Sequence, residues 1–310
     1  MSDPSRYPIV VVPPEAAEQV EQMGSKSKFW YTDERRGLCL FKYTRPGTGE
    51  DWAEKIAEEL CALLDLPHAY YELAVCGGAC GVITESFLAA GERLVPGNEL
   101  LVEADPAYPA LARGAKIRVT QHTLEAIADV LSDDRVRLPL GFSWPAGVES
   151  AWDVFVGYLL LDALIGNTDR HHENWALIEQ TGPGSAPVRW LAPTHDHGSS
   201  LGRNVPDARR EYQLTTKDLN DTPEAYASRA PSKLYLPGRS KALSTFEAFA
   251  EAARMSPHAA EAWIKRLAEV KMDRVDNFFW RVPEDRISRW AVQFAQRILH
   301  FNHSRLLGLL

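Results

Sequence analysis

An apolar run near the middle of the chain breaks abruptly into charged and polar residues and then becomes apolar again. The run, LLLDALIGNTDRHHENWALIE, covers residues 159–179, and its polar insert extends from Asp169 to Asn174. The Gly166-Asn167 pair before the insert favours a surface turn. Turns are built mostly from Gly, Pro, Asn, Asp and Ser, however, whereas this insert gathers Asp, Arg, two His, Glu and Asn. A simple turn therefore has to be weighed against a loop that carries chemistry.

The segments on both sides of this polar loop predict that its two ends are fixed. Residues 150–166 read SAWDVFVGYLLLDALIG and predict a helix, which begins with a capping pattern of Ser150 and Asp153. Its broad apolar face comprises Trp152, Phe155, Val156, Leu159, Leu160, Ala163 and Leu164. The sequence NWALIE at 174–179 predicts a short strand. The loop would thus hang between a buried helix and a strand.

The remaining sequence divides into a strand-rich first part and a helical second part. In chain order, the expected elements are a strand at 7–12, a hairpin of strands at 28–32 and 37–42, a helix at 50–66, a hairpin at 70–88, a connector at 89–98, helices at 122–131 and 150–166, strands at 174–179 and 186–192, an irregular polar stretch at 196–240, and three helices at about 244–255, 257–270 and 284–308. This order predicts an α+β fold with a small β-rich lobe over residues 1–88 and a larger helical lobe over residues 89–310.

The composition argues against several classes of function. With 34 basic and 42 acidic residues among 310, the net charge is −8, which argues against wholesale binding of nucleic acid but permits a local basic cleft. No apolar run reaches the ~20 residues that span a membrane, and the N-terminal MSDPSRYPIVVVPPE has no signal-peptide pattern. Cys39, Cys61, Cys76 and Cys80 lack the spacing of metal ligands. We interpret them as reduced thiols and expect a cytoplasmic protein without a membrane or direct nucleic-acid partner.

Asp169 and Asn174 have the spacing of a phosphoryl-transfer loop. Such a site needs a carboxylate that orients the attacking hydroxyl, and an amide or carboxylate oxygen that binds magnesium beside the phosphates. An Asp followed five residues later by an Asn is the spacing in the catalytic loop of protein kinases. The pattern alone is common by chance, so its weight depends on what else the chain contains.

A second carboxylate stands where such a site would place another metal ligand. In WLAPTHDHGSSL, Asp196 follows an expected strand and precedes Gly198, which gives an Asp-x-Gly turn after a hairpin. The interval from Asp169 to Asp196 leaves room for one hairpin and little else. The simpler interpretation is an aspartate in a turn whose backbone groups are satisfied locally.

A lysine closes the apolar face of an early strand. In GLCLFK, alternation places Leu38, Leu40 and Lys42 on one face, and a lysine there is expected to point into a cleft and bind nucleotide phosphates. The helix that follows offers Glu54, with Glu58 one turn later, as the partner of this lysine. The alternatives are a solvated lysine on an edge strand and a solvated helix face.

A glycine-containing segment precedes that lysine. The stretch GSKSK comprises Gly24, Ser25, Lys26, Ser27 and Lys28; its glycine permits close approach of the backbone, and its lysines add charge that could sit over phosphates. It matches neither G-x-G-x-x-G nor a Walker loop. The segment supports a kinase site because of the order of the motifs along the chain. A glycine loop, a strand lysine, a helix glutamate, a catalytic loop and a metal-binding aspartate follow one another on suitable elements.

The motifs GNTDRHHENWAL and THDHGSSL resemble those of the HipA-like serine/threonine kinases of bacteria, which include CtkA-type members and are distantly similar to phosphatidylinositol 3- and 4-kinases. The resemblance spans about residues 20–205. It implies a two-lobed protein-kinase-like fold with ATP and Mg²⁺ as cofactors. It also implies that Asp169 is the catalytic base, that Asn174 and Asp196 bind magnesium, and that Lys42 binds the ATP phosphates.

The resemblance further implies an adenine contact and has two departures. ITESFL is similar to the hinge of these kinases, so Glu85 to Phe87 would meet adenine mainly through backbone groups. Family members often carry an inhibitory autophosphorylated serine before the loop glycine, where this chain has Glu-Gln-Met at 21–23. Ser25 and Ser27 would be the substitutes, and a phosphate on either would weaken ATP binding through like-charge repulsion. The N-terminal subdomain of longer HipA proteins is not expected here.

The function expected from these residues is transfer of the γ-phosphate of ATP to a Ser or Thr hydroxyl of a protein, with autophosphorylation as a variant of the same reaction. If the chain is the toxin of a toxin–antitoxin system, a small antitoxin would be its partner. A lipid kinase is the main rival within this class. The acidic composition, without a basic or apolar membrane stripe, weighs against that rival.

Two alternatives belong to other classes of protein. The ligands of a metal-dependent phosphohydrolase would be His171, His172, His195, Asp196 and His197. That chemistry wants its His-Asp pair on a helix, whereas Pro193 and Gly198 predict a turn, and we interpret His171 or His172 as a hydrogen-bonding brace. A degenerate kinase-like binding module would be favoured by loss of Lys42, Asp169 or Asp196, and all three are present.

Overall fold

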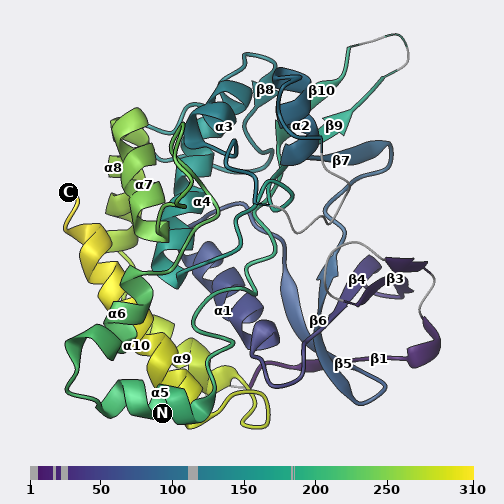
Figure 1. Cartoon of the computed structure of the whole chain (residues 1–310). Helices are drawn as coiled ribbons and strands as arrows, with labels where there is room; N and C mark the ends of the chain where they lie inside the picture. Colours follow the sequence, from purple (N-terminus) through teal and green to yellow (C-terminus); the bar gives the residue numbers. More distant parts are fainter. Residues whose placement is uncertain (1–5, 17–18, 22–26, 111–117, 183, 185) are drawn as a thin grey trace.

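The small lobe, which comprises β1 to β6 with helix α1, is built on a strongly curved sheet (Figure 1). The computed structural model of the protein describes residues 6–16, 19–21, 27–110, 118–182, 184 and 186–310. In this lobe they form a six-stranded sheet in the order β1-β5-β6-β4-β3-β2. The strands are β1 (Ile9–Val12), β2 (Gln19–Glu21), β3 (Lys28–Asp33), β4 (Gly37–Tyr43), β5 (Tyr71–Cys76) and β6 (Ala79–Glu85). β1 runs parallel to β5, and the other pairs in this sheet are antiparallel.

The two faces of this sheet have different environments, because successive side chains of a strand point to opposite faces. On one face, Phe29 and Phe41 stack with 5.2 Å between ring centroids, in a small apolar cluster that also holds Ile83. On the other face, Leu40 and Lys42 line a cleft. The expectation that Lys42 closes an apolar strand face and points into a cleft is therefore confirmed.

The large lobe follows β6 and consists mainly of helices. These are α2 (Gly97–Ala104), α3 (Leu124–Leu131), α4 (Ala151–Ile165), α5 (Asp207–Thr215), α6 (Pro223–Ser228), α7 (Thr245–Met255), α8 (Pro257–Ala268), α9 (Met272–Arg281) and α10 (Arg289–Leu307). The described strands of this lobe are β7 (Glu92–Pro96), β8 (Val136–Arg137), β9 (Ala176–Gln180) and β10 (Val188–Leu191), paired in the order β7-β9-β10-β8. The short strands expected on either side of residues 182–184 are β9 and β10, which pair antiparallel.

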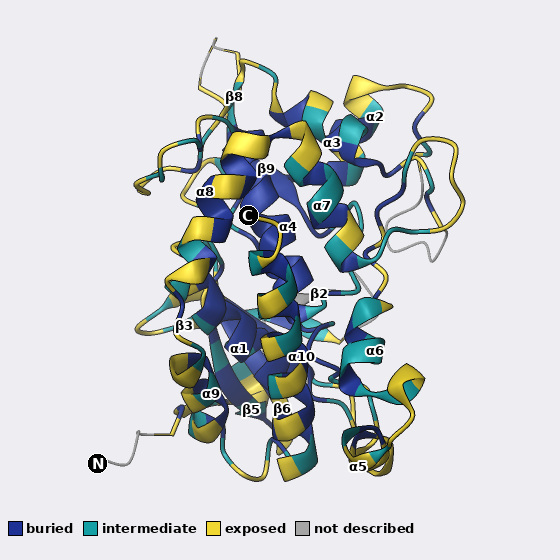
Figure 2. Ribbon diagram, turned by 90° about the vertical axis from the view of Figure 1, so that its left-hand side faces the viewer, coloured by how far each residue is buried: buried dark blue, intermediate teal, exposed yellow. Residues whose placement is uncertain are grey.

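Helix α4 is the centre of the large lobe. All of its residues are buried, and α3, α7, α8 and α10 pack against it. Figure 2 shows exposed residues alternating with more buried ones along the outer helices α8 and α10. The predicted capping box is present, since Ser150 Oγ accepts the N–H of Asp153 at 3.2 Å and the Asp153 carboxylate accepts the N–H of Ser150 at 3.0 Å. The sequence predicted one broad apolar face on this helix. The structure instead buries α4 on all sides, as expected for a helix inside a core.

Helix α1 (Glu50–Leu63) joins the small lobe to the large one. It packs on β5 and β6 and also contacts α4 and α9. Its expected apolar stripe, which includes Ile56 and Leu60, is buried in an apolar core shared with the large lobe. The helix ends at Leu63, short of the predicted end at residue 66, because Asp65 adopts a left-handed conformation with φ 51°.

Three segments without a strong local signal form regular structure. The expected connector at 89–98 forms β7 and the start of α2, because β7 finds a partner strand in β9. The polar stretch at 196–240 contains α5 and α6. Beyond residue 240, where every residue is described, the chain forms four helices rather than three. The helix that was not predicted is α9, which is stabilised by tertiary burial of Val275 and Phe279.

The cysteines are all free, with Cys39, Cys61 and Cys76 buried and Cys80 exposed. Burial raises the pKa of the Cys39 thiol to about 11, so this thiol stays protonated at neutral pH. Among the helices that the structure describes, none combines the length and the apolar character needed to cross a membrane.

Candidate active site

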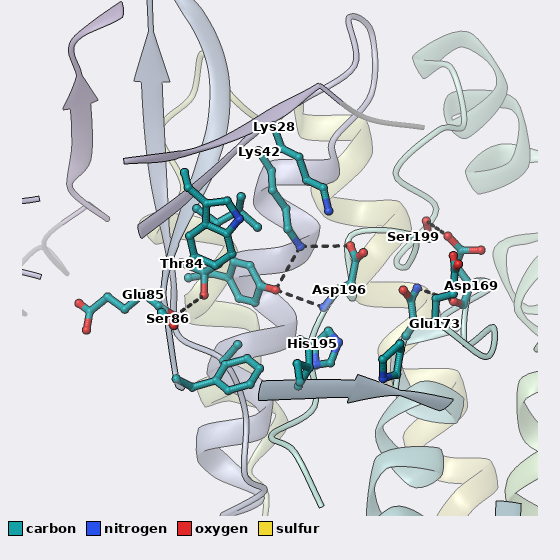
Figure 3. A pocket seen from close by; sticks show the side chains of 18 of the residues that line it. Lys28, Lys42, Thr84, Glu85, Ser86, Asp169, Glu173, His195, Asp196 and Ser199 are labelled. Carbon is teal, nitrogen blue, oxygen red and sulfur yellow. Dashed lines mark hydrogen bonds and ion pairs between the residues drawn. The ribbon is translucent and has the colours of Figure 1, made fainter. Parts of the chain in front are cut away.

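A cavity of about 440 Å³ lies between the two lobes and brings together most of the residues singled out in the sequence. Its lining includes Lys28, Lys42, Glu85, Phe87, Asp169, Asn174 and Asp196 (Figure 3). Ser27 precedes this lining, and its carbonyl accepts the N–H of Tyr43 at 3.1 Å. Gly24, Ser25 and Lys26 lie outside the described residues, so the expected glycine loop stays a prediction there. Two segments far apart in sequence, 28–42 and 169–196, thus face one another across one cavity.

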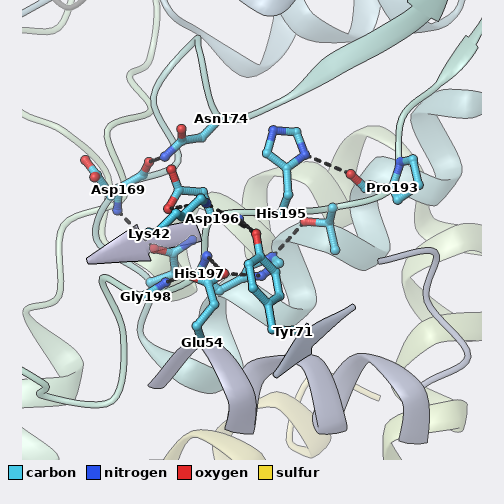
Figure 4. Close-up of polar contacts among 12 residues, drawn as sticks. Lys42, Glu54, Tyr71, Asp169, Asn174, Pro193, His195, Asp196, His197 and Gly198 are labelled. Carbon is cyan, nitrogen blue, oxygen red and sulfur yellow. Dashed lines mark hydrogen bonds and ion pairs between the residues drawn. The ribbon is translucent and has the colours of Figure 1, made fainter. Parts of the chain in front are cut away.

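The polar loop after α4 is held in shape by hydrogen bonds within it. Gly166 ends the helix in the left-handed region with φ 62°, which glycine adopts without strain. Asn174 Nδ2 donates to the carbonyl of Asp169 at 2.7 Å, and the N–H of Asp169 donates to Asn167 Oδ1 at 3.2 Å. The five-residue interval therefore closes the loop and places Asn174 beside Asp169, as Figure 4 shows. With Nδ2 directed into the loop, Oδ1 of Asn174 is the amide atom suited to a cation.

A buried ion pair anchors this loop to α4, and the sequence analysis did not identify it. The guanidinium of Arg170, which is 1% exposed, binds both carboxylate oxygens of Asp162 at 2.7 and 2.9 Å. It also donates to the carbonyl of Asn174 at 2.5 Å and to Thr194 Oγ1 at 3.0 Å. Burial alone would lower the pKa of Arg170, but Asp162 raises it above its ordinary value. One arginine thus connects α4, the polar loop and the segment before Asp196.

The turn that carries Asp196 is conformationally strained, and hydrogen bonds to residues of the small lobe hold its backbone. Asp196 has φ 60°, a left-handed conformation that a non-glycine residue adopts at a cost of about 1–3 kcal/mol. The carboxylate of Glu54, on α1, accepts the backbone N–H groups of His197 and Gly198, each at 2.7 Å. The hydroxyl of Tyr71, on β5, accepts the N–H of Asp196 at 3.2 Å. The small lobe therefore fixes the aspartate turn of the large lobe (Figure 4).

The partner of Lys42 differs from the expectation. A pair of Lys42 with Glu54 or Glu58 was expected, but the ammonium of Lys42 lies 3.5 Å from Asp196 Oδ1 and donates to the Tyr71 hydroxyl at 3.4 Å. Burial would lower the pKa of Lys42, but Asp196, then Tyr71 and Glu54, raise it above its ordinary value. Glu54 has other partners, because its carboxylate accepts the backbone N–H groups of His197 and Gly198.

The choice between Glu54 and Glu58, which the sequence left open, follows from the partners of each. Glu58 forms ion pairs with Lys55 and, at 3.6 Å, with His68, both outside the lining of the cavity. Glu54 reaches the aspartate turn, and its negative charge contributes to the raised pKa of Lys42. Glu54 is therefore the α1 carboxylate that belongs to the site.

We expect Glu54→Gln to weaken binding of Mg²⁺–ATP by roughly ten- to a hundredfold. The amide keeps one acceptor oxygen but presents an NH₂ group to a backbone N–H, and hydrogen bonds to charged groups contribute about 1.5–3 kcal/mol. Isothermal titration with Mg²⁺ and a non-hydrolysable ATP analogue measures the affinity. Glu58→Gln is the matched control on the same helix and should bind like the wild type. Equal affinities for Glu54→Gln and Glu58→Gln would show that Glu54 does not support the turn.

The two histidines of the polar loop brace its conformation. The Nδ1 atom of His171 accepts the N–H of Glu173 at 3.1 Å, and Nδ1 of His172 lies 2.9 Å from the hydroxyl of Tyr108. Burial, followed by the proximity of His171, lowers the pKa of His172. One histidine was expected to act as a brace, and both do so.

The histidines on either side of Asp196 are also bound to protein groups. His195 Nδ1 lies 2.9 Å from the carbonyl of Pro193, and His197 Nε2 lies 2.8 Å from Thr194 Oγ1. Burial lowers the pKa of His195 to about 4 and that of His197 well below its ordinary value, so both rings are neutral at pH 7. Within the described ranges, no group of three or more His, Cys, Asp or Glu side chains is arranged to hold a metal ion. The geometry therefore favours bracing over a histidine-bound metal.

The segment after β6 forms the side of the cavity where adenine was expected. The N–H of Ser86 donates to the carbonyl of Leu38 at 2.8 Å, so this amide is already used within the protein. Phe87 packs against apolar residues of both lobes, and Leu88 and Leu94 add to the apolar lining. Glu85 is paired in register with Cys39 of β4. Glu85 and Phe87 stay the predicted adenine contacts, beside an apolar wall suited to a planar ring.

The cavity thus contains the groups that a nucleotide and a divalent cation require. A lysine suited to phosphate oxygens lies beside a carboxylate, and an amide oxygen and a second carboxylate lie on the facing loop. Carboxylate and amide oxygens are hard donors of the kind that Mg²⁺ prefers. The donor set therefore fits Mg²⁺–ATP, and Asp196 and Asn174 stay the predicted cation ligands.

Similarity to solved structures agrees with this geometry. The crystal structure of the Helicobacter pylori proinflammatory kinase CtkA superposes with a TM-score of 0.72 at 17% identity, over 97% of each chain. The Shewanella oneidensis MR-1 toxin–antitoxin complex of HipA, HipB and operator DNA contains a chain that matches with a TM-score of 0.52 at 12% identity, over 99% of this chain and 69% of the other. The chain therefore has the kinase-like α+β fold of CtkA and HipA, as the sequence predicted. No protein-family model and no curated protein sequence matches this chain.

Proposed function

We propose that this protein is an ATP-dependent kinase that transfers the γ-phosphate to a Ser or Thr hydroxyl of a protein substrate. The observation that carries the proposal is the convergence of the Lys42–Asp196 pair with Asp169 and Asn174 in one cavity. The kinase-like fold supports it independently. The proposal keeps the two lobes at residues 1–88 and 89–310, with the cavity between them.

Each residue of the cavity has a distinct task in this reaction. Lys42 would bind phosphate oxygens of ATP, and Asn174 and Asp196 would hold Mg²⁺, which when bound would supply positive charge beside the transferring phosphate. Asp169 orients the acceptor hydroxyl and accepts its proton. Lys28, the first residue of β3, lines the cavity from the small lobe and would contact the phosphates. The buried Arg170 keeps the loop of Asp169 and Asn174 in place without touching ATP.

The biological setting is proposed from resemblance and composition. The matched HipA structure includes HipB and operator DNA, and a small antitoxin would be the corresponding partner of this chain. We infer a cytoplasmic protein from the cysteine usage, since all four cysteines are free thiols. A phosphatidylinositol-type lipid acceptor is less favoured, because the composition is acidic and offers no basic membrane stripe.

Lys42→Met should lower the rate of phosphoryl transfer by about 10²–10³-fold, as loss of one preorganised electrostatic contact does in other enzymes. The assay supplies Mg²⁺ and γ-labelled ATP with a mixed Ser/Thr protein acceptor, and in parallel with phosphatidylinositol vesicles. Lys217→Met, on an exposed surface lysine, is the control and should keep the wild-type rate.

Three outcomes separate the candidate functions. Label on protein that depends on Lys42 supports the kinase proposal, whereas label confined to the vesicles would replace it with a lipid kinase. Hydrolysis of a phosphate ester with zinc or manganese, without ATP, would favour the metallohydrolase. ATP binding without any transfer would indicate a kinase-like binding module.

A further inference from the structure

A serine hydroxyl contacts the predicted base, Asp169, inside the cavity. Ser199 Oγ donates to Asp169 Oδ2 at 3.5 Å, a long hydrogen bond that Figure 3 shows inside the cavity. Arg203 Nη2 donates to the same Oγ at 3.0 Å. Ser199 and Arg203 both line the cavity with Asp169 and Asp196. Neither Ser199 nor Arg203 was among the residues that the sequence predicted for the site.

The backbone of Ser199 is fixed to the loop that carries Asp169. The carbonyl of Ser199 accepts the N–H of Thr168 at 3.0 Å and the hydroxyl of Thr168 at 3.1 Å. One residue before it, Gly198 is held by Glu54. The serine hydroxyl therefore has a set position beside the predicted base, which preorganises it for reaction.

We propose that Ser199 is an intramolecular acceptor of the γ-phosphate, an inference that rests on the proposed kinase function. Asp169 takes the proton from Ser199 Oγ as this oxygen forms a bond to the γ-phosphorus of ATP. The bond between the γ-phosphorus and the β,γ-bridging oxygen breaks, and ADP leaves with that electron pair. The products are ADP, phosphoserine at 199 and one proton, so no further reactant is needed.

Arg203 gives the product a partner. Its guanidinium already contacts Ser199 Oγ and also pairs with the buried carboxylate of Glu50. A phosphoserine carries about −1.5 to −2 charges at pH 7 and binds readily to a guanidinium. The phosphate would then stay beside Asp169 and occupy the position that a substrate hydroxyl needs. Phosphorylation of Ser199 would therefore limit the enzyme's own turnover.

The adjacent serine, Ser200, differs from Ser199 in its access to the cavity. Ser200 is 2% exposed, its hydroxyl has no hydrogen-bond partner within the described residues, and it does not line the cavity. Adjacent serines in one peptide thus differ in access to the predicted base. Phosphate on Ser199 but not Ser200 would reflect the geometry of the site rather than the exposure of the segment.

The test is phosphopeptide mapping of the full-length protein after incubation with Mg²⁺ and ATP. We expect close to one phosphate per chain at Ser199 in the wild type and in Ser200→Ala, and none there in Ser199→Ala or Asp169→Asn. The rate per chain should stay constant over a tenfold range of protein concentration. Asp169→Asn mixed with the wild type should remain unmodified at Ser199. Modification of Asp169→Asn in that mixture would overturn the intramolecular route.

A second measurement distinguishes an acceptor from a residue that only positions the base. Preincubation with Mg²⁺–ATP should lower the later rate of transfer to a protein acceptor at least tenfold in the wild type. The initial rate of Ser199→Ala can differ from that of the wild type, because the substitution removes the hydroxyl that contacts Asp169. That initial rate should not fall during preincubation. Wild-type turnover with an unmodified Ser199 would refute this inference and leave the kinase proposal standing. Absence of any ATP turnover would overturn both.

Discussion

Asp169→Asn will reduce phosphoryl transfer by about 10²–10⁴-fold, the contribution typical of a positioned general base. The change removes the carboxylate that would take the proton of the acceptor hydroxyl. Binding of Mg²⁺–ATP should stay close to the wild type, because Lys42, Asn174 and Asp196 are retained and lie with Asp169 in the same cavity. The measurements are single-turnover transfer from γ-labelled ATP and titration with a non-hydrolysable analogue.

Asp129→Asn is the matched control, since this carboxylate lies exposed on α3, away from the cavity. It should transfer phosphate at the wild-type rate. Wild-type turnover in Asp169→Asn would show that another group accepts the proton, and the assignment of the base would be wrong. A loss of ATP affinity equal to the loss of rate would instead show that the change damaged nucleotide binding.

Arg170→Met will lower the free energy of unfolding by about 3–5 kcal/mol, the usual effect of leaving one member of a buried ion pair alone. The Asp162 carboxylate would remain inside the core without its bidentate partner. The polar loop would also lose its tie to the carbonyl of Asn174, so activity should fall with stability. Chemical denaturation followed by far-ultraviolet circular dichroism measures the stability.

Two further variants test the physical cause of that loss. Asp162→Leu combined with Arg170→Met removes both charges and should recover much of the stability, though not the position of the loop. Arg254→Met breaks an exposed pair with Glu251 and should cost at most about 1 kcal/mol. Equal losses in Arg170→Met and Arg254→Met would mean that burial of the pair does not determine its energy.

The sequence predicted the parts of the site that depend on local spacing. The interval from Asp169 to Asn174 lets Asn174 Nδ2 donate to the carbonyl of Asp169, and alternation directs Lys42 into the cavity. Such features are encoded within a few residues. Amphipathic periodicity and capping also act locally, so the sequence predicted the two hairpins of the small lobe and the helices α1, α3, α4, α7, α8 and α10.

The contacts that the sequence did not predict join residues far apart in the chain. Glu54 and His197 are separated by 143 positions, and their hydrogen bond depends on how α1 docks against the large lobe. Strand β7 exists because β9 pairs with it, and α9 because the core accepts its apolar side. Arg170 had a detectable signal, since Asp162 is a charged residue inside an otherwise apolar helix and implies a buried partner.

The hydrogen bonds between Glu54 and the aspartate turn have a consequence for how the proposed activity could be regulated. Helix α1 contacts both lobes, and its carboxylate holds the backbone beside Asp196. A displacement of α1 would withdraw that carboxylate and allow the strained turn to relax, so Asp196, the proposed metal ligand, would move as the lobes separate. Under the proposed function, opening of the lobes and loss of activity would then be one event. An effector that shifts α1 from its side near α9 would act as an allosteric inhibitor without entering the cavity.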